Sequence, residues 1–147
     1  MKAKGLMILV IDDNPSYLRV ANKYLTSVGG HSVEVAESGL EGLRKAKERK
    51  PDIILLDLYM PGTDGATVLE TLCADETTQH IPVIIITGAD LEDFDRTTLA
   101  ARPNFKSLEQ KPVNFGELLK KISAMCEFRT EQMYNRNSSA GDALEAQ

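Results

Sequence analysis

Short runs of hydrophobic residues alternate with segments of helical periodicity along most of the chain. The apolar runs at residues 6–11, 32–36, 53–57 and 82–87, with a weaker run at 104–110, predict five strands. The runs at 53–57 and 82–87 are apolar at nearly every position, which is typical of parallel strands covered on both faces. Strands that alternate with helices in this way predict a single α/β domain, with a parallel sheet and helices on both of its faces.

The segments between the predicted strands carry helix start signals and apolar stripes. Asn14 and Pro15 are typical of an N-cap and a first helical position. Ser38 and Glu41 have the spacing of a capping box at the start of a second helix. The residues expected to face inward are Leu18, Ala21, Leu25 and Val28 in the first helix, and Leu40, Leu43 and Ala46 in the second.

Three further helices are predicted, near residues 65–74, near residues 91–100 and after Asn114. The periodic pattern fades at the end of the chain, so we expect one domain over residues 1–128. Residues 129–147 are rich in small and polar side chains and are interpreted as a C-terminal tail, either an extended helix end or a disordered segment.

The last predicted helix carries an apolar stripe formed by Leu119, Ile122 and Cys126. One interpretation is that this helix and residues 128–134 form a docking face, with Leu108 as a passive part of it. Such a face would serve self-association as a homodimer or the binding of a downstream protein. The alternative is a frayed helix end with scattered apolar residues.

Composition excludes several classes of partner. The chain has 147 residues and a formal net charge of −5, without a run rich in Lys or Arg, which argues against a protein that binds nucleic acid. No apolar run approaches the roughly 20 residues of a membrane span. The basic and then apolar N-terminus is short and ends in acids, so it is interpreted as a first strand and not as a signal peptide. We therefore expect a cytoplasmic protein that does not bind membranes.

Polar side chains that suit metal and phosphate chemistry follow the predicted strands. Asp12 and Asp13 follow the first strand, Asp57 ends the third, Thr87 ends the fourth, and Lys111 follows the last. Ligands of open parallel sheets bind at the carboxyl ends of the strands, so these side chains are expected to converge. Three carboxylates with oxygen-rich surroundings suit a hard divalent cation, with Mg²⁺ as first choice.

A cation at this edge would attract a phosphoryl group and screen it from the acids. Lys111 can pair with phosphate oxygens as a point charge, and Thr87 offers a hydroxyl donor. Asp57 can then act as a nucleophile that takes the phosphoryl group as an acyl phosphate. Taken singly, acids after a strand are often helix caps, and a Lys-Pro pair is often a turn. Their joint occurrence at strand ends favours a phosphoryl site.

Four motifs resemble those of the response-regulator receiver domains of two-component systems. They are IDDN at 11–14, LLDLYMPGTDG at 55–65, IIITGA at 84–89 and KPV at 111–113, and the resemblance covers roughly residues 6–127. It implies a flavodoxin-like, doubly wound sheet of five parallel strands in the order 2-1-3-4-5. It also implies that the partner is a histidine kinase or a phosphotransfer protein.

The resemblance assigns a role to each residue of the predicted site. It implies that Asp57 is the phosphoacceptor and that Thr87 and Lys111 contact the phosphoryl group. It implies that Mg²⁺ is held at the acidic cluster of Asp12, Asp13 and Asp57, with the main-chain carbonyl of Tyr59 as a further ligand. A cis peptide before Pro112 is also implied. Such a domain is a signalling module and not an enzyme, because it catalyses only its own phosphorylation and dephosphorylation.

Two departures from the family pattern stand out in the last strand. Receiver domains commonly carry an aromatic residue three positions before the lysine, where this chain has Leu108, and Phe105 is out of register for that role. The usual Gly-Ala before the strand is replaced by residues 101–103, Ala-Arg-Pro. The usual coupling between the threonine and an aromatic side chain is therefore in question, whereas phosphorylation is not.

Two other functions remain open on sequence grounds. An aspartyl-phosphate phosphatase or phosphotransferase of the haloacid-dehalogenase type needs a second acid two residues after the nucleophile, where this chain has Tyr59. The second alternative is a phosphorylation-independent binding module. Such a module would not require the complete set of charged site residues that this chain carries. No output domain is recognised after residue 128, so the chain is interpreted either as a single-domain regulator or as a receiver fragment of a longer one.

Overall fold

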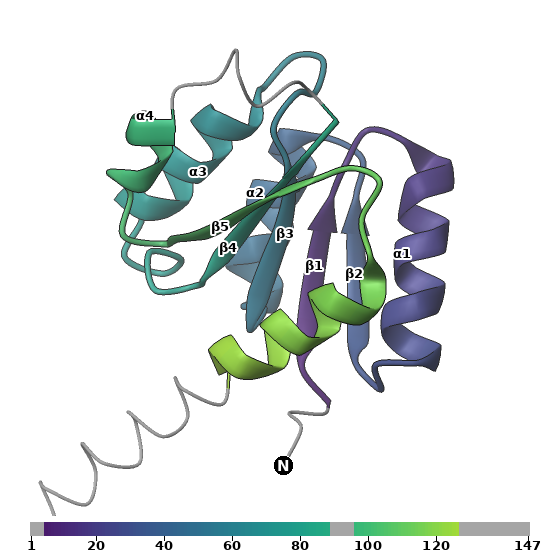
Figure 1. Ribbon diagram of the computed structural model, residues 1–147. Coiled ribbons are helices and arrows are strands. Elements are labelled where there is room, and N and C mark those ends of the chain that lie inside the picture. The colour runs from purple at the N-terminus through teal and green to yellow at the C-terminus, as the bar shows by residue number, and fades with distance from the viewer. Residues whose placement is uncertain (1–4, 89–95, 127–147) are drawn as a thin grey trace, which may run out of the picture.

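Five parallel strands form one sheet in the order β2-β1-β3-β4-β5, as predicted (Figure 1). The computed structural model describes residues 5–88 and 96–126. The strands are β1 (Met7–Ile11), β2 (Ser32–Ala36), β3 (Ile53–Asp57), β4 (Val83–Thr87) and β5 (Phe105–Gln110). All five coincide within two residues with the apolar runs of the sequence, because each run has a turn or helix signal at both ends.

Helices cover both faces of the sheet. They are α1 (Pro15–Ser27), α2 (Gly39–Arg49), α3 (Gly65–Ala74), α4 (Arg96–Ala100) and a final helix over residues 115–126. The apolar side chains of α1 and the final helix belong to one buried cluster, and those of α2, α3 and α4 belong to the other. The predicted doubly wound α/β architecture is therefore confirmed. The part of the predicted fourth helix that precedes residue 96 lies outside the described residues.

The two central strands pack against the helices on both faces of the sheet. Every residue of β3 and β4 is buried, and alternate side chains of each strand enter opposite clusters. Ile54 and Leu56 pack on the side of α2 and α3, whereas Ile53 and Leu55 pack on the side of α1. The site residue Asp57 is the last residue of β3, so its backbone is anchored by this core.

The first helix begins and ends as the sequence predicts, with one error in its inward face. Asn14 Oδ1 accepts hydrogen bonds from the backbone N–H groups of Ser16 and Tyr17, at 3.0 and 3.3 Å. Three of the four residues predicted to face inward are buried, namely Leu18, Ala21 and Leu25. The prediction for Val28 is wrong, because this residue is the C-cap beyond the last turn and is 64% exposed.

The fully buried residues of α2 are small, and Leu43 packs beside them against the same cluster, so the predictions for Leu43 and Ala46 are confirmed. Gly39, Gly42 and Ala46 are buried, whereas Leu40 is 71% exposed, so the prediction that Leu40 faces inward is wrong. A Cβ atom on Gly42 would lie 2.4 Å from the Cδ1 atom of Ile11. The helix therefore approaches β1 more closely than a helix with a leucine at that position could.

The capping box predicted for α2 is only partly formed. Ser38 Oγ accepts a hydrogen bond from the Glu41 N–H at 3.2 Å, as expected of an N-cap. The Glu41 carboxylate accepts from the N–H of Glu37 at 3.1 Å, one residue earlier than a capping box requires.

The last strand contains an irregularity that changes which side chains share a face. A register shift between Val83 and Ile84 leaves one residue of β5 without a partner on β4, so that Phe105 and Leu108 both pack on the side of α3 and α4. Leu118 and Ile122 of the final helix pack on the other side. The expectation that Leu108 joins a face with the final helix is therefore wrong.

The stripe predicted on the final helix belongs to the core. Ile122 is fully buried, Cys126 is 6% exposed, and Leu119 packs against the same cluster as Ile122. The rest of the proposed docking face, residues 128–134, and the predicted tail at 129–147 lie outside the described residues. Among the described residues, no helix has the combination of length and hydrophobicity that would be needed to cross a bilayer.

The start of α3 lies against the end of β3. The Gly65 N–H donates a hydrogen bond to the carbonyl of Leu58 at 2.8 Å, and Asp64 caps the helix by accepting from the Thr67 N–H at 2.8 Å. A Cβ atom on Gly65 would lie 2.4 Å from the backbone oxygen of Asp57. Glycine is therefore required here for the backbone around Asp57 to keep its position.

Gly65→Ala is expected to lower the free energy of unfolding by about 1–3 kcal/mol, because the added methyl group meets backbone atoms that can move only together with β3. Urea unfolding measures this change. The matched control is Gly116→Ala near the start of the final helix, where the nearest atom to an added Cβ is the side-chain oxygen of Asn114 at 3.3 Å. An equal loss of stability in both variants would contradict the prediction.

Candidate functional site

The structure brings the predicted acids together at the carboxyl edge of the sheet. Asp12 follows β1, Asp57 ends β3, and Asp13 lies beside Asp12 at the start of the loop before α1. Each of the three carboxylates can place one oxygen within 4.8 Å of an oxygen of the others. Asp12 and Asp57 are buried, at 2% and 7% exposure, whereas Asp13 is exposed. The cluster therefore has a buried base and one side open to solvent.

Lys111 supplies the positive charge of the site. Its Nζ atom lies 2.7 Å from Asp12 Oδ2, a buried carboxylate that would otherwise carry an uncompensated charge. The backbone N–H of Lys111 donates to the carbonyl of Thr87 at 2.8 Å, which fixes the loop after β5 against the end of β4. Thr87 is itself 1% exposed. The peptide bond between Lys111 and Pro112 is cis, as expected.

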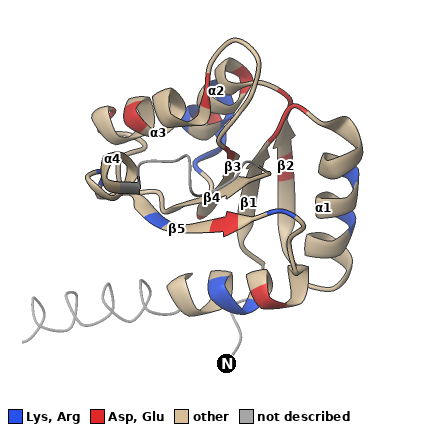
Figure 2. Cartoon of the chain, turned by 45° about the horizontal axis from the view of Figure 1, so that its top comes forward, with Lys and Arg blue, Asp and Glu red and all other residues tan. Residues whose placement is uncertain are grey.

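The distribution of charge agrees with this arrangement. In Figure 2, acidic segments follow β1 and end β3, and a basic segment follows β5. Asn14 contributes a backbone N–H that donates to Asp12 Oδ1 at 2.9 Å. Both oxygens of Asp12 therefore have a donor, which helps to explain how this carboxylate is tolerated in a buried position.

The electrostatic environment raises the pKa of Asp57 to about 6 from an ordinary value of 3.8. The largest cause is burial, and the negative charge of Asp12 adds to it. The ammonium group of Lys111 opposes the shift, as does the Tyr59 N–H, which lies 3.4 Å from Asp57 Oδ1. Near neutral pH, the Asp57 carboxylate is therefore ionised, and its negative charge is only partly offset by neighbouring groups. Such a carboxylate suits a nucleophile or a metal ligand.

The acidic cluster fits a small divalent cation. Oxygen ligands of one Mg²⁺ ion, at roughly 2.0–2.1 Å from the metal, lie about 3–4 Å apart. The oxygens of Asp12, Asp13 and Asp57 lie within 4.8 Å of one another, so only a small inward movement would allow all three to reach one ion. Hard carboxylate donors without a sulfur or imidazole ligand match the preference of Mg²⁺.

Tyr17 is a site residue that sequence analysis missed. The Lys111 Nζ atom lies 4.3 Å from the centroid of the Tyr17 ring. The phenolic oxygen is buried and has no hydrogen-bond partner among the described residues. Burial, followed by the charges of Asp12 and Asp57, raises the pKa of Tyr17 to about 12, so the phenol remains protonated. No motif marks this position, because Tyr17 lies in the first turn of a helix and meets Lys111 only in the folded chain.

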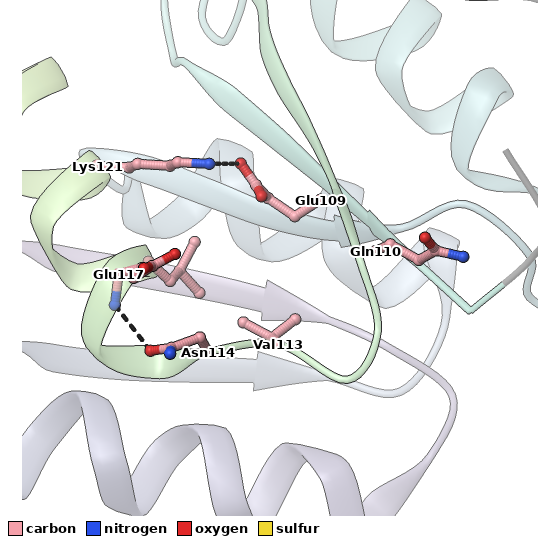
Figure 3. Close-up of a pocket in the computed structure, with 7 residues that line it drawn as sticks. Glu109, Gln110, Val113, Asn114, Glu117 and Lys121 are labelled. Atoms are coloured by element: carbon pink, nitrogen blue, oxygen red, sulfur yellow. Dashed lines mark hydrogen bonds and ion pairs between the residues drawn. The ribbon is translucent and has the colours of Figure 1, made fainter.

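Residues of β5, the loop after it and the final helix line a hollow that includes none of the three site acids (Figure 3). Glu109 of β5 and Lys121 of the final helix form an ion pair across it, with Nζ and Oε1 2.6 Å apart. At the start of the helix, the Glu117 N–H donates to Asn114 Oδ1 at 3.0 Å. The ion pair between Glu109 and Lys121 therefore joins the strand to the helix, and the residues that line the hollow include none of the predicted site residues.

Comparison with known proteins identifies the family. Residues 8–123 match the family model of the response regulator receiver domain. The chain belongs to this family. Protein PilH from Pseudomonas aeruginosa is 37% identical over 118 residues, which cover 80% of this chain and 95% of that protein. Response regulator PleD from Caulobacter vibrioides is 46% identical over 83 residues, but the matched part spans only 18% of that protein.

Solved receiver domains have the same fold. A CheY-like receiver domain protein from Methanospirillum hungatei aligns with a TM-score of 0.76 at 26% identity, over 88% of this chain and 99% of that one. The receiver domain of the sensor histidine kinase PA1611 from Pseudomonas aeruginosa aligns with a TM-score of 0.74 at 26% identity, over 84% and 98% of the two chains. That structure has a magnesium ion coordinated in its active site cleft.

Asp57→Asn is expected to stabilise this receiver domain near neutral pH without divalent metal. Because the pKa of Asp57 is higher in the folded protein than its ordinary value, ionisation favours unfolding, and stability falls as pH rises from about 4 to about 6. The difference between a pKa of about 6 and the ordinary 3.8 corresponds to about 3 kcal/mol in the free energy of unfolding, which solvent screening reduces to about 1–2 kcal/mol.

Urea unfolding at about pH 7.5 and about pH 4 tests this expectation, and the stabilisation should shrink at the lower pH. Glu76→Gln, at an exposed acid outside the site, is the control for loss of one negative charge. A gain in Asp57→Asn that is the same at both pH values would show that ionisation of the carboxylate is not its cause.

Proposed function

We propose that this receiver domain accepts a phosphoryl group on Asp57 from the phosphohistidine of a histidine kinase or phosphotransfer protein, with Mg²⁺ as cofactor. The observation that carries the proposal is the convergence of three carboxylates and one ammonium group at the end of the sheet. Asp12, Asp13 and Asp57 can bring oxygens within 4.8 Å of one another, and Lys111 Nζ lies 2.7 Å from Asp12. Membership of the receiver family supports the same chemistry.

The reacting atom is the carboxylate oxygen of Asp57 that does not face the Tyr59 N–H. This oxygen forms a bond to phosphorus while the bond between phosphorus and the histidine nitrogen breaks, and the nitrogen leaves with the bonding electron pair. The Tyr59 N–H, 3.4 Å from Asp57 Oδ1, orients the other oxygen. With its pKa raised to about 6, Asp57 is ionised and available for attack at neutral pH.

The other residues of the site position the phosphoryl group and offset its charge. Lys111 pairs with a phosphoryl oxygen, and Thr87 at the end of β4 donates its hydroxyl to another. Asp12, Asp13, Asp57 and the main-chain carbonyl of Tyr59 are the proposed ligands of the metal. Bound there, Mg²⁺ supplies positive charge that offsets the repulsion between the carboxylates and the incoming phosphoryl oxygens.

The alternative of a phosphatase or phosphotransferase enzyme gains no support from the site. Such an enzyme needs a second acid two residues after the nucleophile, and Tyr59 occupies this position with a side chain that is 53% exposed. We propose instead that the domain works in the cytoplasm, where its phosphorylation state controls binding of a downstream protein. The chain spans nearly all of PilH but a minor part of PleD, so both a single-domain regulator and a receiver of a longer protein agree with the comparisons.

Incubation with acetyl phosphate and Mg²⁺ is expected to add one phosphoryl group, detected by intact mass. Asp57→Ala should abolish this addition, because no other carboxylate of the site ends a strand opposite Lys111 and Thr87. Asp64→Ala, which removes the acid that caps α3, serves as the control and should still be phosphorylated. Persistence of the added mass in Asp57→Ala would refute the assignment of the phosphoacceptor.

Asp13→Ala is expected to weaken Mg²⁺ binding by about 10-fold or more, because it removes one of three ligand charges while leaving the buried pair of Asp12 and Lys111 intact. Isothermal titration with Mg²⁺ measures the affinity. Glu76→Ala removes the same charge from an exposed position outside the site and should leave the affinity within about twofold. If both variants bind Mg²⁺ as the unmodified protein does, Asp13 is not a ligand.

A further inference from the structure

We propose that Tyr17 is a positioning residue that holds the Lys111 ammonium group in place for the phosphoryl oxygens. The inference rests on the proposed function of the site. The Nζ atom of Lys111 lies 4.3 Å from the centroid of the Tyr17 ring and 2.7 Å from Asp12 Oδ2. These two contacts come from different elements, the start of α1 and the end of β1, and together they define one position for the ammonium group.

A lysine needs such support because its side chain has four rotatable bonds. Lys111 is only partly buried, at 25% side-chain exposure, so packing alone does not order it. The face of an aromatic ring attracts an ammonium group without occupying its N–H donors in hydrogen bonds. Tyr17 can therefore fix the ammonium group while leaving donors available for a phosphoryl oxygen, which a second carboxylate would not do.

The ring of Tyr17 is itself held by other aromatic side chains. Its centroid lies 6.2 Å from that of Phe115, at the start of the final helix, and the Phe115 ring lies 5.3 Å from that of Tyr24 on α1. The three rings close the seam between α1 and the final helix, where Tyr17 and Phe115 pack against the buried cluster. Tyr17 is thus a rigid platform and not a mobile surface tyrosine.

The ring and the hydroxyl have separable roles. The hydroxyl is buried and makes no hydrogen bond to any of the described residues, so it does not hold the ring in place. The contact with Lys111 is made to the face of the ring. Tyr17→Phe should therefore preserve the positioning of Lys111, whereas Tyr17→Leu should remove it.

The experiment measures the affinity for beryllofluoride, a mimic of the phosphoryl group, by isothermal titration in saturating Mg²⁺. Tyr17→Leu should bind about 3- to 10-fold more weakly than the unmodified protein, as expected for loss of one cation–π contact in a partly buried site. Tyr17→Phe should bind within about twofold of the unmodified protein. The matched control is Tyr24→Leu, which removes the other aromatic contact of Phe115 but none of Lys111.

A spectroscopic measurement tests the same contact without relying on beryllofluoride binding. The ε-methylene protons of Lys111 should resonate upfield of those of other lysines in the unmodified protein and in Tyr17→Phe, because the Nζ atom bonded to that carbon lies over the ring, 4.3 Å from its centroid. In Tyr17→Leu this shift should be lost. Unfolding midpoints show whether each variant is folded, and Tyr17→Met replaces Tyr17→Leu if the latter is not.

Four results would overturn the inference. They are an unmodified protein without the upfield shift, a Tyr17→Leu variant that binds beryllofluoride normally, a Tyr17→Phe variant as weak as Tyr17→Leu, and a Tyr24→Leu variant as weak as Tyr17→Leu. The last result would mean that the affinity for beryllofluoride depends on packing of the seam and not on contact with Lys111. If Asp57 accepts no phosphoryl group in the unmodified protein, the proposed function fails instead, so the two failures are distinguishable.

Discussion

The ion pair between Lys111 and Asp12 is the contact on which the rest of the site depends. Asp12 is 2% exposed, and removing its partner would leave a buried charge without compensation, beside the already crowded carboxylate of Asp57. Several features of the fold serve to bring the ammonium group there. The register of β5 sets Gln110 opposite Thr87, and the next residue, Lys111, then bonds through its N–H to the Thr87 carbonyl. A slip of one residue would carry the lysine away from the acids.

Sequence reasoning located the strands and the charged site residues because both have local signals. Apolar runs mark the buried strands, and Asp12, Asp57 and Thr87 stand directly at their ends, so a parallel arrangement alone brings them to one edge. It failed for the inward face of α2, where the residue that determines the packing is small. The face of α2 is built on Gly42, whose missing side chain makes room for Ile11, and a search for large apolar residues selected the exposed Leu40 instead.

Two further features have no local signal at all. Phe105 and Leu108 are three residues apart, a spacing that places side chains on opposite faces of a regular strand, yet the irregularity in β5 brings both to the side of α3 and α4. The contact between Tyr17 and Lys111 joins the first turn of α1 to a loop near the other end of the chain. Such a contact follows from the packing of α1 beside that loop, which no periodicity in the sequence encodes.

These two features together explain how the site is built without the usual aromatic residue of the last strand. Leu108 packs into the cluster on the side of α3 and α4 and does not contribute a ring to the site. The aromatic ring that meets the lysine comes from α1, through Tyr17, and continues through Phe115 to the final helix. The ammonium group of Lys111 therefore has two described contacts, the carboxylate of Asp12 and the ring of Tyr17, and the second leads to the seam between α1 and the final helix, on the opposite face of the sheet from Leu108. A displacement of the ammonium group would act both on the buried carboxylate of Asp12 and on this seam, because coupling is carried by ion pairs and packed side chains that are in contact.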